Sequence, residues 1–338
     1  MQRRGIMTST TTSPLVNVRL TLAYLAEQPI IHTDETIGNI SKLKKMRVIY
    51  NGKPESIPAL SGNSFRGQLR DILADQLCSS LSDGGMAPLT FTNNDAYGIL
   101  YSGGALGEKN TSAVLLKDFQ TNIPSIRLMG AAFGNVMLPS KLAATHIVPC
   151  AEQTRHIVQH MYDVFNPPLF SEEAWPKARD LLFNDGPLTR KDDARDLTRQ
   201  RFANPGNVTL AASVSGDAGE EERQKGQQMI YYVECIPAGT WLVQQLYSKL
   251  PLDKFELGCF FDGLTAFLDQ PSIGGRSAAG YGQVRVTIRG TIGTENISWP
   301  SEWPSAVTQA MTAYQTHLKT KQSDILKALT AQQQKANI

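Results

Sequence analysis

The chain has 338 residues, of which 33 are Lys or Arg and 31 are Asp or Glu, so its formal net charge is +2. This length suits one domain with large insertions or two domains, and the 41% of hydrophobic residues is enough for a buried core. The near balance of charge neither indicates nor excludes nucleic acid, because a binding protein can gather its positive charge on one face.

The composition also argues against several classes of protein. No apolar run approaches the length of a membrane span, so no membrane partner is expected. The four cysteines lie far apart and form no Cys-x-x-Cys pair, which is typical of reduced thiols in a cytoplasmic protein. The segment 1–14 contains two arginines but no apolar stretch after them, so we expect a disordered tail rather than a secretory signal.

The ordered chain is expected to begin at Leu15, where apolar and polar residues alternate over 16–22 as in a half-buried strand. Asn51-Gly52 then predicts a hairpin, because both residues suit a type I′ turn. An apolar stripe every three or four residues predicts a helix over 65–81, with Asn63 or Ser64 as its cap. Residues 82–110 are rich in glycine and polar residues and predict an irregular insertion.

The middle of the chain divides into a strand-like part and a projecting part. Residues 126–134 and 136–148 are typical of two strands or of one kinked strand. Residues 151–228 predict an insertion that projects from the core, composed of helices over 154–165 and 171–183, a charged segment over 188–201 and a Gly/Ser/Glu-rich stretch over 213–226.

The C-terminal part returns to regular structure. It predicts strand character over 229–243, an amphipathic helix over 253–269, a strand from Val284 and a terminal helix within 301–338. Without the insertions the order is strand, helix, strand, strand, helix, strand. We therefore predict an α+β fold with a ferredoxin-like core, related to the RNA-recognition motif and formed by 15–150 and 229–300, with the insertions as finger and thumb elements.

The start of the first helix is a candidate phosphate site. Gly62 and Ser64 precede two arginines, Arg66 and Arg70, that share one helix face. Backbone N–H groups at a helix N-terminus attract anions, and arginines hold phosphate oxygens. The alternative is a solvated helix face on which Arg70 pairs with Asp71.

A second candidate site is the glycine-rich loop over 274–282, which has four glycines in nine residues. Such a loop allows unusual dihedral angles and brings its backbone close to a ligand. We expect Gly275, Arg276 and Ser277 to contact phosphate, and Tyr281 to stack on a base or sugar. It lacks the Gly-Lys-Ser/Thr of a P-loop and follows a helix instead of a strand, which excludes a dinucleotide fingerprint. The alternative is a flexible turn.

The remaining basic residues form two groups. Lys42, Lys44 and Lys45 make a run after the first strand, and Arg190 and Arg199 lie in a segment where acidic residues alternate with basic ones. Charged runs are usually solvated faces, so these residues indicate RNA binding only together with other features. Catalytic patterns are poor: the five histidines are scattered, and no HExxH or GxSxG motif is present. We expect no catalytic residue, no metal and no cofactor.

Five motifs in the same order resemble the RAMP superfamily of CRISPR-associated proteins, and within it the backbone subunit. They are the helix start at 62–70, SIRLMGAAFG at 125–134, a TRKDD segment where the family inserts its thumb, YYVECIPAGTW at 231–241 and the loop at 274–282. The long 151–228 insertion makes the chain most similar to the type IV branch. The resemblance implies that the residues named above contact guide RNA in an antiviral or anti-plasmid effector complex.

The resemblance also implies how the subunit works. Copies assemble head to tail along a CRISPR guide RNA in a filament, with other effector subunits, and target nucleic acid binds through the guide. Ser41 stands where cleaving relatives have an aspartate, so we expect no target cleavage. Two alternatives stay open: an endoribonuclease of the same superfamily that uses His32 or Asp34 to process guide precursors, and a stand-alone RNA-binding module.

Overall fold

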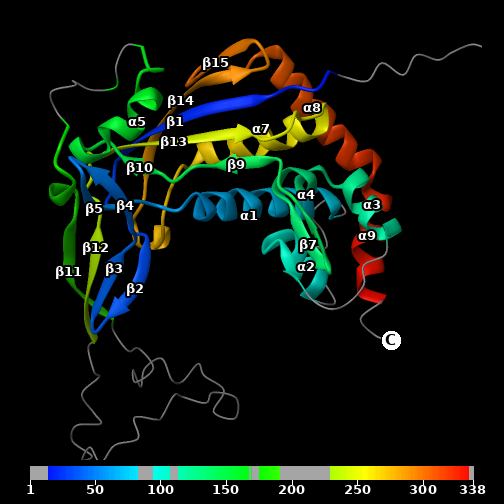
Figure 1. Ribbon diagram of the computed structural model, residues 1–338. Coiled ribbons are helices and arrows are strands. Elements are labelled where there is room, and N and C mark those ends of the chain that lie inside the picture. The colour runs from blue at the N-terminus through cyan, green and yellow to red at the C-terminus, as the bar shows by residue number, and fades with distance from the viewer. Residues whose placement is uncertain are drawn as a thin grey trace, which may run out of the picture.

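The computed structural model of the chain describes residues 14–82, 94–106, 113–166, 169, 175–190 and 229–334. Its centre is an antiparallel sheet with the strand order β10-β13-β1-β14-β15, and β9 pairs with β13 beside β10 (Figure 1). These strands are β1 (Val18–Ala26), β9 (Leu142–Ala144), β10 (Val148–Pro149), β13 (Trp241–Ser248), β14 (Val284–Ile292) and β15 (Glu295–Trp299).

Strand β1 occupies the middle of this sheet. It pairs with β13 from Arg19 to Leu25 and with β14 along its whole length, so both of its edges are hydrogen-bonded. Its apolar residues Leu20, Leu22 and Tyr24 are fully buried. A strand that is apolar at these positions and paired on both sides belongs inside a sheet, and β1 thereby brings the N-terminal part of the chain against strands from its C-terminal part.

Three helices cover one face of the central sheet (Figure 1): α1 (Gly62–Leu81), α7 (Lys254–Asp269) and α8 (Ser305–Thr320). The stripe of α1 that contains Phe65, Leu69 and Leu73 is buried, and the Phe65 ring meets Phe267 of α7 edge to face with 5.2 Å between centroids. Gly258 lets α7 and α8 approach closely, since a Cβ there would collide with the Ala310 carbonyl oxygen.

An arm of β-structure extends from one end of the sheet. It contains a four-stranded sheet in the order β11-β12-β3-β2 and a hairpin of β4 and β5. A second hydrophobic cluster joins this hairpin to the short helices and to the central sheet. The elements are β2 (Thr33–Ile37), β3 (Ile40–Leu43), β4 (Lys45–Tyr50), β5 (Lys53–Pro58), η1 (Glu152–Thr154), α5 (Arg155–Tyr162), η3 (Ala178–Leu181), β11 (Phe183–Arg190) and β12 (Met229–Cys235).

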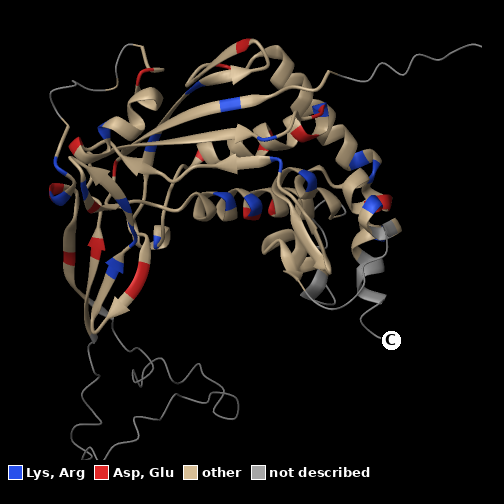
Figure 2. Ribbon diagram, viewed as in Figure 1, with Lys and Arg blue, Asp and Glu red and all other residues tan. Residues whose placement is uncertain are grey.

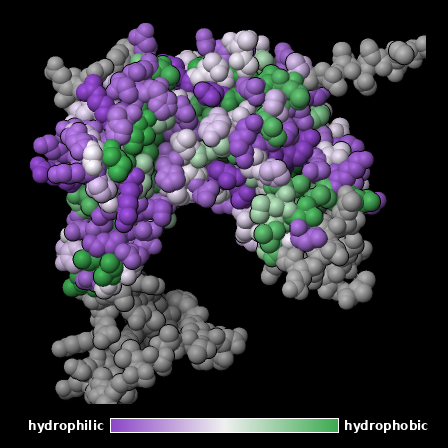
Figure 3. Space-filling view, viewed as in Figure 1, coloured by the Kyte–Doolittle hydropathy of each residue, from purple (hydrophilic) through white to green (hydrophobic). Residues whose placement is uncertain are grey.

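A lobe of short helices lies at the other end of α1. Its elements are α2 (Asn94–Tyr101), β6 (Gly104–Leu106), α3 (Ala113–Asn122), α4 (Pro124–Met129), β7 (Ala131–Gly134), β8 (Val136–Leu138) and α9 (Gln322–Gln334). The space-filling view shows a hollowed face between this lobe and the arm, with α1 crossing above it (Figures 1 and 3). Among the described helices none is long and apolar enough to cross a membrane.

Most of the strongly periodic elements expected from the sequence are present. The β1 strand, the Asn51-Gly52 hairpin, the helices α1, α5 and α7, and the strand β14 are confirmed. Asn51 and Gly52 both have positive φ angles, of 49° and 74°, as the predicted type I′ turn requires. The four cysteines are free, and three of them are buried.

Four predictions of secondary structure were wrong. Residues 124–129 form the helix α4 instead of a strand, because a short segment buried on nearly every side shows no period. The supposed irregular insertion contains α2, and the described part of 171–183 is coil, η3 and the start of β11 instead of an α-helix. The terminal helix is two helices, α8 and α9, which meet at Lys321. Residues 1–13 of the tail expected over 1–14 and the Gly/Ser/Glu-rich stretch over 213–226 lie outside the described residues.

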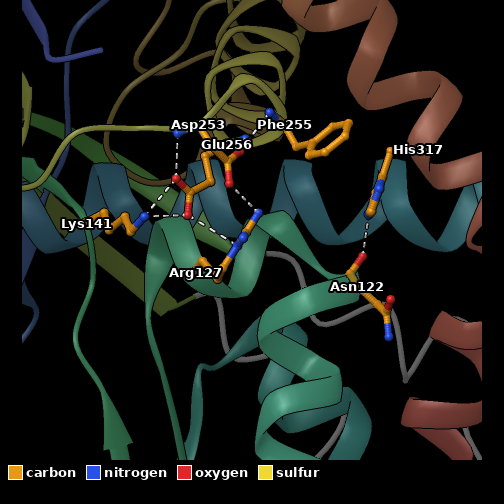
Figure 4. Close-up of polar contacts among 7 residues, drawn as sticks. All are labelled: Asn122, Arg127, Lys141, Asp253, Phe255, Glu256 and His317. Carbon is orange, nitrogen blue, oxygen red and sulfur yellow. Dashed lines mark hydrogen bonds and ion pairs between the residues drawn. The ribbon is translucent and has the colours of Figure 1, made fainter. Parts of the chain in front are cut away.

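A buried carboxylate joins α7 to the lobe (Figure 4). The Glu256 side chain has no exposed surface, and its oxygens lie 2.7 Å from Lys141 Nζ and 3.2 Å from Arg127 Nε. Glu256 also accepts a hydrogen bond from the backbone N–H of Asp253, the N-cap of α7, and Asp253 pairs with Arg127 at 3.0 Å. The charge of Glu256 is thus matched by two cations, and α4 is held against the start of α7.

We expect Glu256→Ala to lower the free energy of unfolding by about 3–5 kcal/mol, because it leaves the partly buried Lys141 without its carboxylate and Arg127 with Asp253 alone. Urea unfolding of the variant and of the wild-type chain measures this loss. The control is Glu295→Ala, which removes an exposed carboxylate from β15. Equal unfolding midpoints for the two variants would contradict the role of the buried network.

Candidate nucleic-acid interface

The two glycine-containing motifs predicted from the sequence face each other across one cleft. The cleft has a volume of about 390 Å³ and is lined on one side by the first turns of α1 and on the other by the glycine-rich loop. A second, more open groove of about 620 Å³ lies beside it and shares Ser272 and Ser277. The lining of the first cleft is Ser64, Phe65, Gly67, Gln68, Asp71, Ile147, Ser272, Ile273, Gly274 and Ser277.

The start of α1 is held by a serine cap and by a close backbone contact. Ser61 is the N-cap, and its hydroxyl accepts from the Ser64 N–H at 3.2 Å. The predicted caps, Asn63 and Ser64, were therefore wrong, because the helix begins earlier, at Gly62. Ser64 instead donates its hydroxyl proton to the Ser61 carbonyl at 2.7 Å. Gly62 lies so close to the carbonyl of Ala144 that no side chain fits.

Two glycines in the same helix make a matched pair for a stability test. Gly62→Ala is expected to lower the free energy of unfolding by about 1–3 kcal/mol, because its Cβ overlaps backbone atoms of Ala144 and Thr145. Gly67→Ala has open space around its Cβ and is expected to raise the free energy of unfolding by about 1 kcal/mol. Thermal and urea unfolding measure the change in the free energy of unfolding for both variants. Equal changes of the same sign would contradict the close approach of Gly62 to the Ala144 backbone.

Arg66 and Arg70 point together to the C-terminal end of α4. Arg66 Nη2 donates to the Met129 carbonyl at 2.9 Å, and Arg70 Nη2 donates to the carbonyls of Met129 and Gly130 at 3.1 and 3.2 Å. Burial lowers the pKa of both guanidinium groups. Within the described residues neither pairs with a carboxylate, so the predicted alternative of an Arg70–Asp71 ion pair was wrong.

Both arginines lie outside the lining of the cleft. They are a brace between α1 and α4, in which cations meet the carbonyl end of a helix. Along α1 two arginines are followed by two aspartates, and residues of both signs lie over the arm (Figure 2). A contact of Arg66 or Arg70 with phosphate therefore stays a prediction, and it would use guanidinium donors that the α4 carbonyls leave over.

The glycine-rich loop is fixed to the core through its backbone. The N–H of Gly275 donates to Ile31 at 2.7 Å, and the N–H of Gly282 donates to Pro29 at 2.8 Å. Gly274 has a φ of 86°, and a Cβ at this position would collide with the Ile31 carbonyl. The loop is thus a formed structure in which glycine is required by close packing, and the alternative of a flexible turn is not favoured.

Two side chains of the loop dock onto the arm. Arg276, in the left-handed region with φ 61°, places its guanidinium 5.1 Å from the ring centroid of Tyr231. The Tyr281 hydroxyl donates to Asp185 at 2.5 Å, and its ring packs against the small apolar cluster of the arm. Burial and the bond to Asp185 raise the pKa of Tyr281. In this conformation the Tyr281 ring is a packing contact, whereas Ser277 lines both grooves.

The predicted basic run is paired with acidic side chains. Lys42 Nζ and Lys45 Nζ lie 2.8 Å and 3.7 Å from the carboxylate of Glu234, and Lys44 Nζ lies 2.8 Å from Asp34. Arg190 is the last residue of β11, and Arg199 lies outside the described residues. RNA binding by these basic residues stays a prediction.

The residues considered for RNA cleavage have structural partners. Ser41 is buried in β3, opposite Thr36 of β2 and Val233 of β12. His32 Nε2 accepts from the Ser61 N–H at 3.2 Å, so the ring holds the cap of α1. Asp34 is the partner of Lys44. Within the described residues, no group of three or more His, Cys, Asp or Glu side chains gathers as a metal site requires.

No protein-family model matches the chain, and no curated protein matches its sequence. A chain of a solved type IV-B CRISPR complex is similar, with TM-score 0.50 and 18% identity over 86% of this chain and 96% of that chain. The chain has the fold of a CRISPR-complex subunit. Csc2 from Thermofilum pendens matches with TM-score 0.36 and 14% identity over 96% of this chain and 84% of that chain.

The similarity of fold to a chain of a CRISPR complex agrees with the resemblance to CRISPR-associated proteins that the five sequence motifs indicate. The same fold shows which residues sequence reasoning missed. Glu234, Asp185 and the Met129 carbonyl hold the basic run, the glycine-rich loop and the two arginines, respectively. Glu234 and Met129 had a signal in the sequence, since they lie in the YYVECIPAGTW and SIRLMGAAFG motifs, whereas Asp185 had none. Partners such as Asp185 depend on strand register, which local patterns do not reveal.

The His32 bond to the α1 cap predicts a dependence of stability on pH. The pKa of His32 is lowered by burial and by the nearby charges of Lys44 and His146, although Asp34 acts in the opposite direction. In the unfolded chain its pKa is about 6.5. The unfolded state therefore takes up the proton first, and the free energy of unfolding falls as the pH drops through and below that value.

Urea unfolding between pH 5 and 8 measures this slope. We expect His32→Gln to reduce the slope below pH 6.5, because glutamine keeps a neutral acceptor without titrating. The control is His156→Gln, which replaces an exposed histidine and leaves the slope as in the wild-type chain. A slope that is unchanged in His32→Gln would contradict the role of this ring at the cap.

Proposed function

We propose that the protein is a non-catalytic RNA-binding subunit of a type IV-like CRISPR effector complex, in which copies line up along a guide RNA. The single observation that carries the proposal is the cleft between α1 and the glycine-rich loop, because two motifs from distant parts of the sequence line it together. The similarity of fold to a chain of a type IV-B CRISPR complex supports it.

The core of this subunit is, in our proposal, a ferredoxin-like unit. The order β14-β1-β13-β10 places the first and third core strands at the centre, as in the split βαβ arrangement. Helix α1 follows the first strand and α7 follows the third, and both cover the same face. We further propose that the arm carries the thumb. Residues 191–228 connect the last residue of β11 to the first residue of β12, and both strands belong to the arm.

The chemistry of the cleft suits a sugar-phosphate backbone. Its polar lining consists of the Ser64, Ser272 and Ser277 hydroxyls, the Gln68 amide, backbone groups beside Gly67 and Gly274 next to the N-terminus of α1, and one carboxylate, that of Asp71, which can accept from ribose hydroxyls. Such groups hold phosphate and ribose without reading bases. Sequence specificity would then come from base pairing between guide and target, the division of labour known for another RNA-guided effector.

The absence of catalysis is part of the proposal. His32 accepts a backbone hydrogen bond, Asp34 pairs with Lys44, and Ser41 is buried, and these structural roles support the proposal. Labelled guide precursor and labelled target RNA incubated with the purified protein should both stay intact on a denaturing gel. Cleavage at one site that His32→Ala or Asp34→Ala abolishes would favour the endoribonuclease instead.

A carboxylate placed in the cleft tests the binding site. Gly67 lines the cleft and has open space at its Cβ, so Gly67→Asp adds charge without a clash. We expect RNA affinity to fall about fivefold, which corresponds to about 1 kcal/mol of repulsion between charges roughly 4 Å apart in water. Fluorescence anisotropy with labelled single-stranded RNA of several sequences measures it, and all sequences should weaken alike.

Gly67→Ala is the matched control and should bind as the wild-type chain does. Equal affinity of Gly67→Asp and Gly67→Ala would exclude the cleft as the RNA path. The assembly is tested separately by sedimentation with guide RNA of increasing length. Open-ended head-to-tail association predicts particles that grow with the RNA, whereas a stand-alone module predicts one small complex of constant size.

A further inference from the structure

The basic run of the arm is neutralised by carboxylates that lie outside it in the sequence. Lys42 and Lys45 both approach Glu234 of β12, and Lys44 approaches Asp34 of β2. None of the three pairs joins sequence neighbours, and each depends on the packing of β2, β3 and β12. The pairing is therefore a feature of the folded arm and involves every lysine of the run.

Glu234 differs from an ordinary surface acid in its environment. Its side chain is 7% exposed, and each oxygen has its own partner: Oε1 accepts from Lys42 Nζ at 2.8 Å and Oε2 accepts from the Leu43 N–H at 3.0 Å. Burial alone would raise its pKa, but the bonds to Lys42 and Leu43 and the charge of Lys45 outweigh it and keep the pKa low. Glu234 is therefore a fixed anion that holds two partly exposed cations.

The lysines have more freedom than the anion that holds them. The side chains of Lys42 and Lys45 are 33% and 37% exposed, and each ammonium has three donors, of which Glu234 takes at most one. Lys45 lies 3.7 Å from the carboxylate, beyond a hydrogen bond, and is held by charge alone. Both side chains can turn to another anion without any movement of the backbone.

We propose that Glu234, assisted by Asp34, acts as an internal substitute for phosphate. In the RNA-free protein Glu234 pairs with Lys42 and Lys45, and Asp34 pairs with Lys44, until phosphate groups of RNA displace the carboxylates. This inference rests on the proposed RNA-binding function. The carboxylates reduce the attraction of the arm for any polyanion, so that RNA binds firmly only when its other contacts with the subunit are made as well. Glu234 thus determines selectivity and is not itself a contact to RNA.

The proposal has a counter-intuitive consequence, namely that removing an acid strengthens binding. Glu234→Gln keeps an oxygen for the Leu43 N–H but loses the charge that holds the two lysines. Each lysine released toward phosphate steepens the dependence of log affinity on log salt by about 0.7 for single strands. We expect affinity for random-sequence single-stranded RNA to rise about threefold to tenfold near 0.1 M salt, with a steeper slope. Asp34→Asn should act in the same direction through Lys44 alone.

The matched control is Glu295→Gln, which changes the net charge by the same unit at an exposed position of β15, outside the arm. Anisotropy titrations at several salt concentrations compare the three variants with the wild-type chain, and thermal unfolding checks that each one folds. If Glu234→Gln fails to fold, Asp34→Asn decides, because Asp34 is half-exposed and its loss leaves no buried group unpaired.

The outcomes separate this inference from the proposed function. A wild-type chain that ignores RNA at all salt concentrations would overturn the proposed function itself. A wild-type chain that binds, with Glu234→Gln and Asp34→Asn binding equally or more weakly at an unchanged salt slope, would overturn only the phosphate substitute. An equal gain in Glu295→Gln would also overturn it, because the effect would then come from net charge.

Discussion

The pairing of β1 between β13 and β14 is the constraint on which the rest of the structure depends. β1 is hydrogen-bonded on both sides, to strands from the C-terminal part of the chain. Because α1 follows the arm hairpin and the glycine-rich loop precedes β14, this pairing brings the start of α1 and the loop to the same end of the sheet. Loss of the register would separate the two walls of the cleft.

A second set of interactions fixes the parts around this sheet. The buried Glu256 ties α4 to α7, and the end of α4 accepts hydrogen bonds from the two arginines of α1. In the arm, Glu234 joins β12 to β3, and Asp185 holds the glycine-rich loop. Polar groups with partners on other elements therefore connect the arm, the central sheet and the lobe. These contacts fix the positions of the elements that border the hollowed face.

The fold gives the basic residues of the candidate site partners that the sequence does not reveal. Lysines and arginines that suggest a phosphate clamp when read along the sequence are, in the folded chain, braces or members of ion pairs. The cleft itself is lined by hydroxyl, amide and backbone groups, by the Asp71 carboxylate and by apolar side chains. The proposed RNA-binding surface would carry little excess charge, in line with the net charge of +2.

The sequence by itself determined the elements with a strong period or a specific turn: β1, α1, α7, β14 and the Asn51-Gly52 hairpin. It also identified both walls of the cleft, because glycine clusters and a helix start are local signals. Only the tertiary structure decided the partners of the charged side chains, the helical state of 124–129 and the docking of Tyr281. These depend on contacts between residues far apart in the sequence, where burial and register outweigh local preference.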